Sequence, residues 1–102
     1  MELTITRRDD DAGNGTLGLV GSIDLTTRQA MLDAGMDVLA RGGSLTLDMA
    51  DVDFIDSTGI GALVELTKAA ESKGSRLMVS GRSARVSRVL EATGLEDAWN
   101  RA

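Results

Sequence analysis

The sequence contains no cysteine, no histidine and no proline among its 102 residues. Without cysteine it cannot form a disulfide, a thiolate zinc site or a cysteine nucleophile. Without histidine it has no imidazole base, no serine–histidine–aspartate triad and no histidine-ligated metal. Only Phe54 and Trp99 are aromatic, so aliphatic side chains must fill the core. We therefore expect no catalytic residues of these kinds and no metal site.

Basic residues are also scarce, since 11 Lys and Arg stand against 16 Asp and Glu, giving a net charge of −5. This balance argues against direct binding to nucleic acid, which requires cations to neutralise phosphates, and against docking on an anionic membrane. The N-terminal residues lack the apolar core of a signal peptide. No run approaches the ~20 apolar residues that span a bilayer. We expect a single cytoplasmic domain over residues 1–102, without a cofactor.

The hydrophobic periodicity predicts seven elements in the order β-β-α-β-α-β-α. The predicted strands lie near residues 2–6, 17–23, 45–49 and 76–80, with an apolar patch at 52–55 that leads towards Asp56. The predicted helices run from a cap at Thr26 or Thr27 to about Ala40, from about Thr58 to Ser72, and from a cap at Ser83 to Gly94. The tail, residues 95–102, is compatible with a short helix or a last strand.

Each predicted helix has an apolar face at helical spacing. The faces expected to point inward are Met31, Leu32, Gly35, Met36, Val38 and Leu39 in the first helix, Ile60, Leu63, Val64, Thr67 and Ala70 in the second, and Val86, Val89 and Leu90 in the third. Strands that alternate with helices imply parallel crossover units. The fold class is therefore α/β, with a mixed, mostly parallel sheet, an antiparallel N-terminal hairpin and helices packed on the sheet.

An acidic run, Asp9-Asp10-Asp11, opens a Gly-rich turn that ends at Gly15. Such a run could indicate a calcium-binding loop, but the alternating acidic spacing of a calcium loop and its distal Glu are both missing. We predict a solvated hairpin turn.

Ligands of open α/β sheets bind beyond the carboxyl ends of the strands. Two segments reach that edge, residues 21–24 and residues 53–61. The second segment places Ser57 between a strand end and a helix start, with Gly59 and Gly61 allowing close approach of the backbone. We expect the Ser57 hydroxyl to be exposed and to face free N–H groups of the helix.

Three interpretations of the second segment remain open on local chemistry. Ser57 or Asp56 could be a plain N-cap, which contributes roughly 1 kcal/mol. Gly59-x-Gly61 could cradle a nucleotide phosphate, although the third glycine of a dinucleotide fingerprint is missing and Val64 stands in its place. Ser57 could instead be a covalently modified switch, because a phosphate is favourable at a helix N-terminus.

Three stretches together resemble the STAS domain, and more narrowly the bacterial anti-sigma-factor antagonists. They are Gly21-x-Ile23-Asp24, Asp56-Ser57-Thr58-Gly59-Ile60-Gly61 and Val89-Leu90-Glu91-Ala92-Thr93-Gly94-Leu95. Asp-Ser-Thr-Gly alone is weak, but the three stretches stand in the family's order and cover nearly the whole chain.

The resemblance implies a partner-switching regulator of bacterial transcription, not an enzyme. In that family the unphosphorylated form binds an anti-sigma factor that is also a serine kinase, and this binding frees the sigma factor. Phosphorylation of the motif serine, here Ser57, ends binding, and a serine phosphatase resets the switch. The residues that the resemblance assigns to the switch and partner surface are Ile23, Asp24, Leu25, Asp56, Thr58, Gly59 and Ile60.

Two rival functions share parts of this sequence pattern. The first rival is a scaffold subunit that uses the same fold without phosphorylation, since some STAS proteins bind the ATPase of a lipid transporter. The intact Asp56-Ser57-Thr58-Gly59 favours the switch over that role. A small nucleotide-binding enzyme is the second rival. It would have only carboxylates and lysines for acid–base chemistry.

Overall fold

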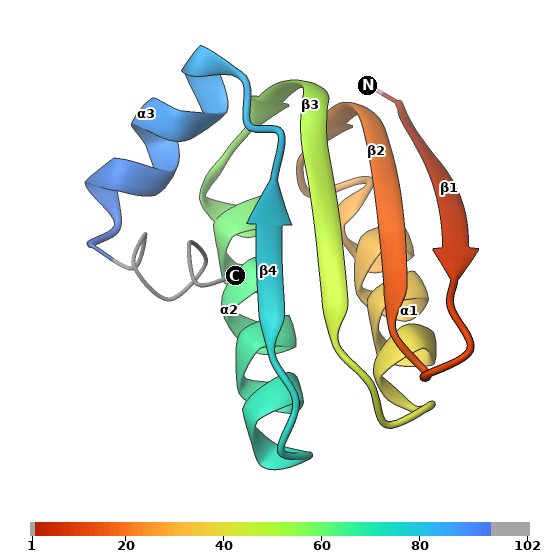
Figure 1. The fold of residues 1–102 in the computed structure, drawn as a ribbon. Coiled ribbons are helices and arrows are strands. Elements are labelled where there is room, and N and C mark those ends of the chain that lie inside the picture. Colours follow the sequence, from red (N-terminus) through yellow and green to blue (C-terminus); the bar gives the residue numbers. More distant parts are fainter. Residues whose placement is uncertain (1, 95–102) are drawn as a thin grey trace.

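The seven predicted elements are present, in the predicted order, in the computed structural model, which describes residues 2–94 (Figure 1). They are β1 (Leu3–Asp9), β2 (Gly15–Ile23), α1 (Arg28–Leu39), β3 (Leu45–Ile55), α2 (Ser57–Ser72), β4 (Leu77–Ser80) and α3 (Ala84–Ala92). The prediction for residues 95–102 lies outside the described residues.

The four strands form one sheet in the order β1-β2-β3-β4. β1 pairs antiparallel with β2, whereas β2 with β3 and β3 with β4 are parallel. The predicted mixed sheet with an antiparallel N-terminal hairpin is therefore confirmed. The carboxyl ends of β2 and β3 reach the same edge, at the top of Figure 1, where α2 begins.

One face of the sheet is covered by α1 and α2, which lie behind the strands in Figure 1. Alternate residues of β2 and of the first half of β3 point to that face, and Leu17, Leu19, Leu45 and Leu47 among them are buried. They pack with buried aliphatic residues of the helices, and this layer is the hydrophobic core. The burial of Leu and Met in place of aromatic side chains agrees with the composition.

The helices turn slightly different faces inward from those expected. In α1, Met36 is 37% exposed, whereas Met31, Leu32, Gly35, Val38 and Leu39 are buried. In α2, the buried residues are Gly59, Ala62, Leu63, Leu66 and Ala70. Ile60, Val64 and Thr67, expected inward, are only half-buried. The buried stripe of α2 thus includes Leu66, which the expected stripe omitted. In α3, Val86 and Leu90 are buried as expected, while Val89 is half-buried.

β3 is longer than predicted, because it continues through the apolar patch to Ile55. Its register against β2 slips twice, between Gly18 and Val20 and between Gly21 and Ser22, and each slip adds one residue to β3. These β-bulges reverse the inward–outward alternation. For that reason the buried positions shift from Met49 to Val52 and then to Ile55.

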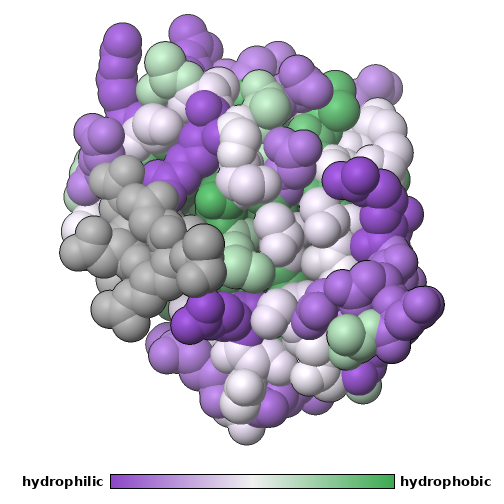
Figure 2. Space-filling model, viewed as in Figure 1, coloured by the Kyte–Doolittle hydropathy of each residue, from purple (hydrophilic) through white to green (hydrophobic). Residues whose placement is uncertain are grey.

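The other face of the sheet carries mainly small and polar side chains. Thr16, Gly18, Thr46, Asp48 and Met78 are among them, and all are half-buried. Figure 2 views this face and shows pale and hydrophilic residues around small hydrophobic areas. No helix of residues 2–94 has the length and apolarity needed to cross a membrane.

The acidic segment forms the predicted hairpin turn between β1 and β2. The Asp10 carboxylate accepts hydrogen bonds from the backbone N–H groups of Ala12 and Asn14, both at 2.9 Å, and from the Asn14 side chain at 3.1 Å. These bonds, led by the one from the Asn14 backbone, lower the pKa of Asp10. The acidic residue at the head of the turn therefore organises its own loop.

Candidate functional site

Two loops lie side by side at the carboxyl ends of β2 and β3. The Asp56 N–H donates to the Ile23 carbonyl oxygen at 3.3 Å, which joins the two strand ends. The Thr27 hydroxyl donates to the Ser22 carbonyl oxygen at 2.8 Å and accepts from the Asp24 N–H at 3.0 Å. These bonds fix the loop after β2 against the loop that enters α2.

Asp56 is the N-cap of α2. Its Oδ1 accepts hydrogen bonds from the N–H groups of Thr58 at 2.9 Å and Gly59 at 3.1 Å, and from the Thr58 hydroxyl at 2.5 Å. The bond from the Thr58 hydroxyl is the main cause that lowers the pKa of Asp56, and the Gly59 backbone bond adds to it. Asp56 is therefore ionised at neutral pH.

Asp24 organises the neighbouring loop in a similar way. Its Oδ1 accepts from the Thr26 hydroxyl at 2.7 Å, the Thr26 N–H at 2.9 Å and the Thr27 N–H at 3.2 Å. The Thr26 hydroxyl is the leading cause that lowers the pKa of Asp24. The charge of Asp24 in turn opposes the lowering of the Asp56 pKa, so the two carboxylates lie within electrostatic reach of each other. The edge therefore carries two fixed negative charges.

Ser57 is the first residue of α2 and is exposed. Within residues 2–94 its hydroxyl makes no hydrogen bond, and the cap role belongs to Asp56, so the alternative of a Ser57 cap is wrong. The expected free N–H groups are also largely taken. Those of Thr58 and Gly59 bond to the Asp56 side chain, and that of Ile60 bonds to the Asp56 carbonyl oxygen. The serine hydroxyl is thus presented to solvent.

Gly59 and Gly61 have different surroundings. A Cβ on Gly59 would lie 2.8 Å from Ile23 Cγ2, 2.8 Å from Ile55 Cγ1 and 2.9 Å from the Ile23 carbonyl oxygen. A Cβ on Gly61 would meet nothing within 4 Å. Gly59 therefore allows α2 to pack against the ends of β2 and β3. Its burial and its bonded N–H contradict the interpretation of Gly59-x-Gly61 as an open phosphate cradle.

The residues assigned to the partner surface divide by exposure. Leu25 is 72% exposed, and Asp24, Asp56, Thr58 and Ile60 are half-buried at the edge. The Ile23 side chain is fully buried, and Gly59 is buried and has no side chain, so neither residue offers side-chain surface to a partner in this structure. These two residues support the loops from the side of the hydrophobic core.

Further contacts support the site between residues that are far apart in the sequence. Arg28, at the start of α1, donates from Nε to the Thr58 carbonyl oxygen at 3.4 Å, and its Nη2 lies 3.5 Å from Glu65 Oε1. Ser22 Oγ donates to Asp53 Oδ1 at 3.1 Å. Thr27 was expected only as a helix cap. These contacts join residues about thirty positions apart, and no local sequence pattern marks them.

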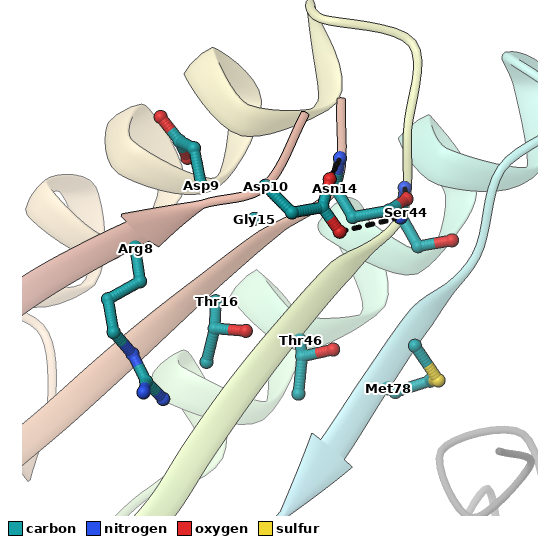
Figure 3. Close-up of a pocket in the computed structure, with 9 residues that line it drawn as sticks. All are labelled: Arg8, Asp9, Asp10, Asn14, Gly15, Thr16, Ser44, Thr46 and Met78. Carbon is teal, nitrogen blue, oxygen red and sulfur yellow. Dashed lines mark hydrogen bonds between the residues drawn. The ribbon is translucent and has the colours of Figure 1, made fainter. Parts of the chain in front are cut away.

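A shallow groove of about 420 Å³ lies at the opposite end of the sheet. Its lining combines the acidic turn with the first residues of β2 and β3 and with Met78 of β4 (Figure 3). Asp10, Asn14 and Ser44 are tied to each other there, since the Asn14 side chain accepts from the Ser44 N–H at 2.8 Å. The groove is thus separate from the edge that carries Ser57.

The chain is similar to known proteins in sequence and in fold. The family model described as "Mlab, STAS domain" matches residues 6–99. An anti-sigma-B factor antagonist of Listeria monocytogenes is 31% identical over 99 residues, which are 95% of this chain and 86% of that protein. A crystal structure of an anti-sigma factor antagonist from Mycobacterium paratuberculosis is 26% identical, with a TM-score of 0.75, and the match covers 96% of this chain and 83% of that one.

A third relative, the Bacillus protein SpoIIAA, is similar in fold alone. Its unphosphorylated form gives a TM-score of 0.82 and its phosphorylated form 0.76, each at 16% identity and each covering 96% of this chain. The matches cover 86% and 89% of the SpoIIAA chains. The same architecture thus exists in a protein that is known both with and without a phosphate.

Proposed function

We propose that this chain, which belongs to the STAS-domain family, is an anti-sigma-factor antagonist. Phosphorylation of Ser57 switches its binding off. The unphosphorylated protein binds an anti-sigma factor that is also a serine kinase, and this binding releases the sigma factor. A serine phosphatase returns the phosphorylated form to the active state. The exchange takes place in the cytoplasm.

The observation that carries this proposal is the presentation of Ser57. Its hydroxyl is exposed at the head of α2 on a loop whose backbone is held by Asp56. A kinase needs a hydroxyl that it can reach without unfolding the substrate. The neighbouring loop offers Leu25, 72% exposed, as an apolar contact for a partner bound over the same edge. Acceptor and docking surface would therefore coincide.

The switch follows from electrostatics at this edge. A phosphate adds about −1.5 to −2 charges at neutral pH, next to the ionised Asp24 and Asp56. A partner carboxylate ~6 Å from one added charge would be opposed by ~3 kcal/mol at an effective dielectric of ~20, which weakens binding ~100-fold. The positive end of the α2 dipole tolerates the phosphate, so we expect the loss to fall on the interface and the helix to stay intact.

The direct test measures affinity for the cognate anti-sigma factor by titration calorimetry, using wild type, Ser57→Ala and Ser57→Asp. We expect Ser57→Ala to bind like wild type and to resist release by kinase and ATP. Ser57→Asp should bind at least 10-fold more weakly, with partial recovery at high salt because screening weakens exposed charges. Mass spectrometry of the treated wild type should place one phosphate on Ser57.

A matched control is Ala84→Asp, because Ala84 is the exposed first residue of α3, just after its N-cap Ser83. It introduces the same charge at the same position of a different helix, and should leave affinity unchanged. A phosphate on another residue, or equal affinity for wild type and Ser57→Asp, would overturn the proposed switch.

The partner surface can be tested apart from the phosphate. Leu25→Ser removes an exposed apolar side chain, so folding stability should remain near wild type while affinity falls several-fold. Met36→Ser is the control, because Met36 is also partly exposed but lies towards the C-terminal end of α1. Equal effects of both variants on binding would show that the interface does not lie at this edge.

The alternative role as a scaffold subunit of a lipid-transport ATPase uses the same fold without phosphorylation. The exposed Ser57 favours the switch, since a scaffold does not need a reachable hydroxyl. In the same titrations, a scaffold would keep its partner with either substitution at Ser57. A binding role, in either case, is supported over nucleotide chemistry by the buried Gly59.

A further inference from the structure

The outer edge of β1 is an unpaired strand edge in the described part of the chain. β1 spans seven residues and hydrogen-bonds to β2 on one side, whereas no strand of residues 2–94 lies on its other side. In Figure 1 it forms the right-hand border of the sheet. A strand edge of this length is a template for pairing with another extended chain.

The hydrogen-bond pattern shows which backbone groups point outward. Continued by one residue, the β1–β2 register places Glu2 opposite Ser22, and the Ser22 N–H donates to the Glu2 carbonyl oxygen at 2.9 Å. At the other end, Asp10 and Asn14 are opposed in the same way, with a 2.9 Å bond from the Asp10 N–H. In an antiparallel pair, bonded and non-bonded positions alternate. Even-numbered residues therefore bond to β2, and Leu3, Ile5 and Arg7 direct their N–H and C=O groups outward.

Two charged side chains of this segment lack partners within residues 2–94. Glu2 and Arg8 are exposed and take part in no ion pair there, whereas Arg7 and Arg41 both bond to Asp9. Arg8 lies on the open face of the sheet, in register with Thr16, Thr46 and Met78 (Figure 3). Glu2 directly precedes β1 and Arg8 is the penultimate residue of β1, six residues further on.

We propose that β1 pairs with β1 of a second copy of this chain, antiparallel, with Ile5 on the two-fold axis. In this register the outward groups of Leu3, Ile5 and Arg7 meet those of the partner's Arg7, Ile5 and Leu3. Glu2 faces the partner's Arg8 on the open face, twice by symmetry. The two four-stranded sheets become one sheet of eight strands.

This register is favoured by the side chains over its neighbours. A shift that centres the axis on Thr6 would place Ile5 opposite Arg7 and Leu3 opposite Asp9, separating the apolar residues. A shift that centres it on Thr4 would leave Arg8 beyond the pairing. With Ile5 at the centre, the partly buried Ile5 side chains meet on the helix face, where Leu3 and Ile5 already border the core. Opposite charges and apolar pairs stabilise an antiparallel contact.

The contact is a single pair of strands, so it falls below the ~1,200 Å² typical of stable complexes, and we expect a dimer populated at about 0.1–1 mM chain. The pairing leaves the carboxyl ends of β2 and β3, where Ser57 lies, accessible in both copies. The pairing is independent of the proposed switch, and each can fail without the other.

Disulfide trapping tests the register directly, because the chain has no cysteine of its own. Thr4 would lie opposite the partner's Thr6 as a non-bonded pair with a Cα separation of ~4.5 Å, within the range that a disulfide spans. An oxidised mixture of Thr4→Cys and Thr6→Cys should yield cross-linked dimer, mostly as the mixed species. Either variant alone should cross-link far less, since the like positions lie ~7–8 Å apart or more. Any affinity tag is placed at the C-terminus.

Charge reversal provides a second, independent test by sedimentation velocity from 20 µM to 1 mM. Glu2→Arg and Arg8→Glu should each weaken dimerisation at least ~5-fold, because two opposite-charge pairs become two like-charge pairs. The double variant should regain wild-type association. Circular dichroism confirms that each variant is folded. A chain that is monomeric at 1 mM, a dimer unaffected by both reversals, or no mixed cross-link would overturn the proposal.

Discussion

The two ends of the sheet are both rich in aspartate, but the carboxylates at the two ends have different interaction partners. At the hairpin end, Asp10 bonds to its own turn and Asp9 pairs with Arg7 and Arg41. At the other end, Asp24 and Asp56 hold two loops with no arginine or lysine paired to either within residues 2–94, and leave Ser57 and Leu25 exposed between them. Carboxylates at both ends accept hydrogen bonds from their own loops, but within residues 2–94 only the hairpin end has one of these aspartates paired with arginine. We therefore expect an added negative charge to have a larger effect at the Ser57 end.

The largest expected effect concerns the packing beneath the Ser57 end. Gly59→Ala should lower the free energy of unfolding by about 2 kcal/mol, because the new methyl group would overlap Ile23 and Ile55 and overpacking costs about 1–3 kcal/mol. Gly61→Ala, two residues along the same helix, has open space and should stabilise by about 0.5–1 kcal/mol through helix propensity. Urea unfolding measures both. Equal effects would show that Gly59 is not a packing requirement.

The next comparison removes one carboxylate from each end. Asp56→Ala should cost about 1 kcal/mol of stability through loss of the N-cap and should also weaken partner binding, because the loop around Ser57 loses its anchor. Asp56→Asn should keep most of the stability, since asparagine is an equally good cap. Asp10→Ala should disturb the hairpin turn alone and leave binding unchanged. Urea unfolding and calorimetric titration separate these results; a binding defect in Asp10→Ala would contradict the division between the two ends.

The pH dependence of stability should arise at both ends. The folded-state pKa values of Asp10, Asp24 and Asp56 are lowered by their hydrogen bonds. A lowered pKa in the folded state means that the stabilisation is present above the unfolded value of ~3.9 and is lost as the pH falls through the folded value. The urea midpoint should therefore be flat above about pH 5 and fall below about pH 4. The double variant Asp24→Asn, Asp56→Asn should show a shallower fall, and an unchanged profile would assign the loss to other carboxylates.

The smallest expected effect compares the same substitution at two helix starts. Ala84→Asp should gain about 0.3–1 kcal/mol from the α3 dipole. Ser57→Asp should gain less, because Asp24 and Asp56 oppose the new charge at α2. Thermal melts at low and high salt resolve the difference, which should shrink with salt. A larger gain in stability from Asp at position 57 than from Asp at position 84 would show that the start of α2 is not the more negatively charged of the two helix starts.

The sequence was sufficient for the element order, the sheet type and the segment around Ser57, because periodicity and glycine placement are local signals. It was insufficient where tertiary contacts decide. The two bulges in β3 reverse the alternation after Met49, so the stretch to Ile55 did not read as one strand. Ile23 was assigned to the partner surface, but the sheet end turns it into the core. Arg28 reaches Thr58 only because α1 and α2 lie together.

The hydrogen bond between the Thr58 hydroxyl and Asp56 bears on which of two adjacent alcohols can act as a nucleophile. The Thr58 hydroxyl donates to the carboxylate that also caps the helix, and Thr58 is half-buried. For a kinase to reach its oxygen, the side chain would have to turn away from the cap. Ser57, in contrast, is exposed, and its hydroxyl makes no hydrogen bond within residues 2–94. The loop therefore discriminates between neighbouring positions before any kinase engages it, and a single phosphoryl group per molecule is the expected stoichiometry.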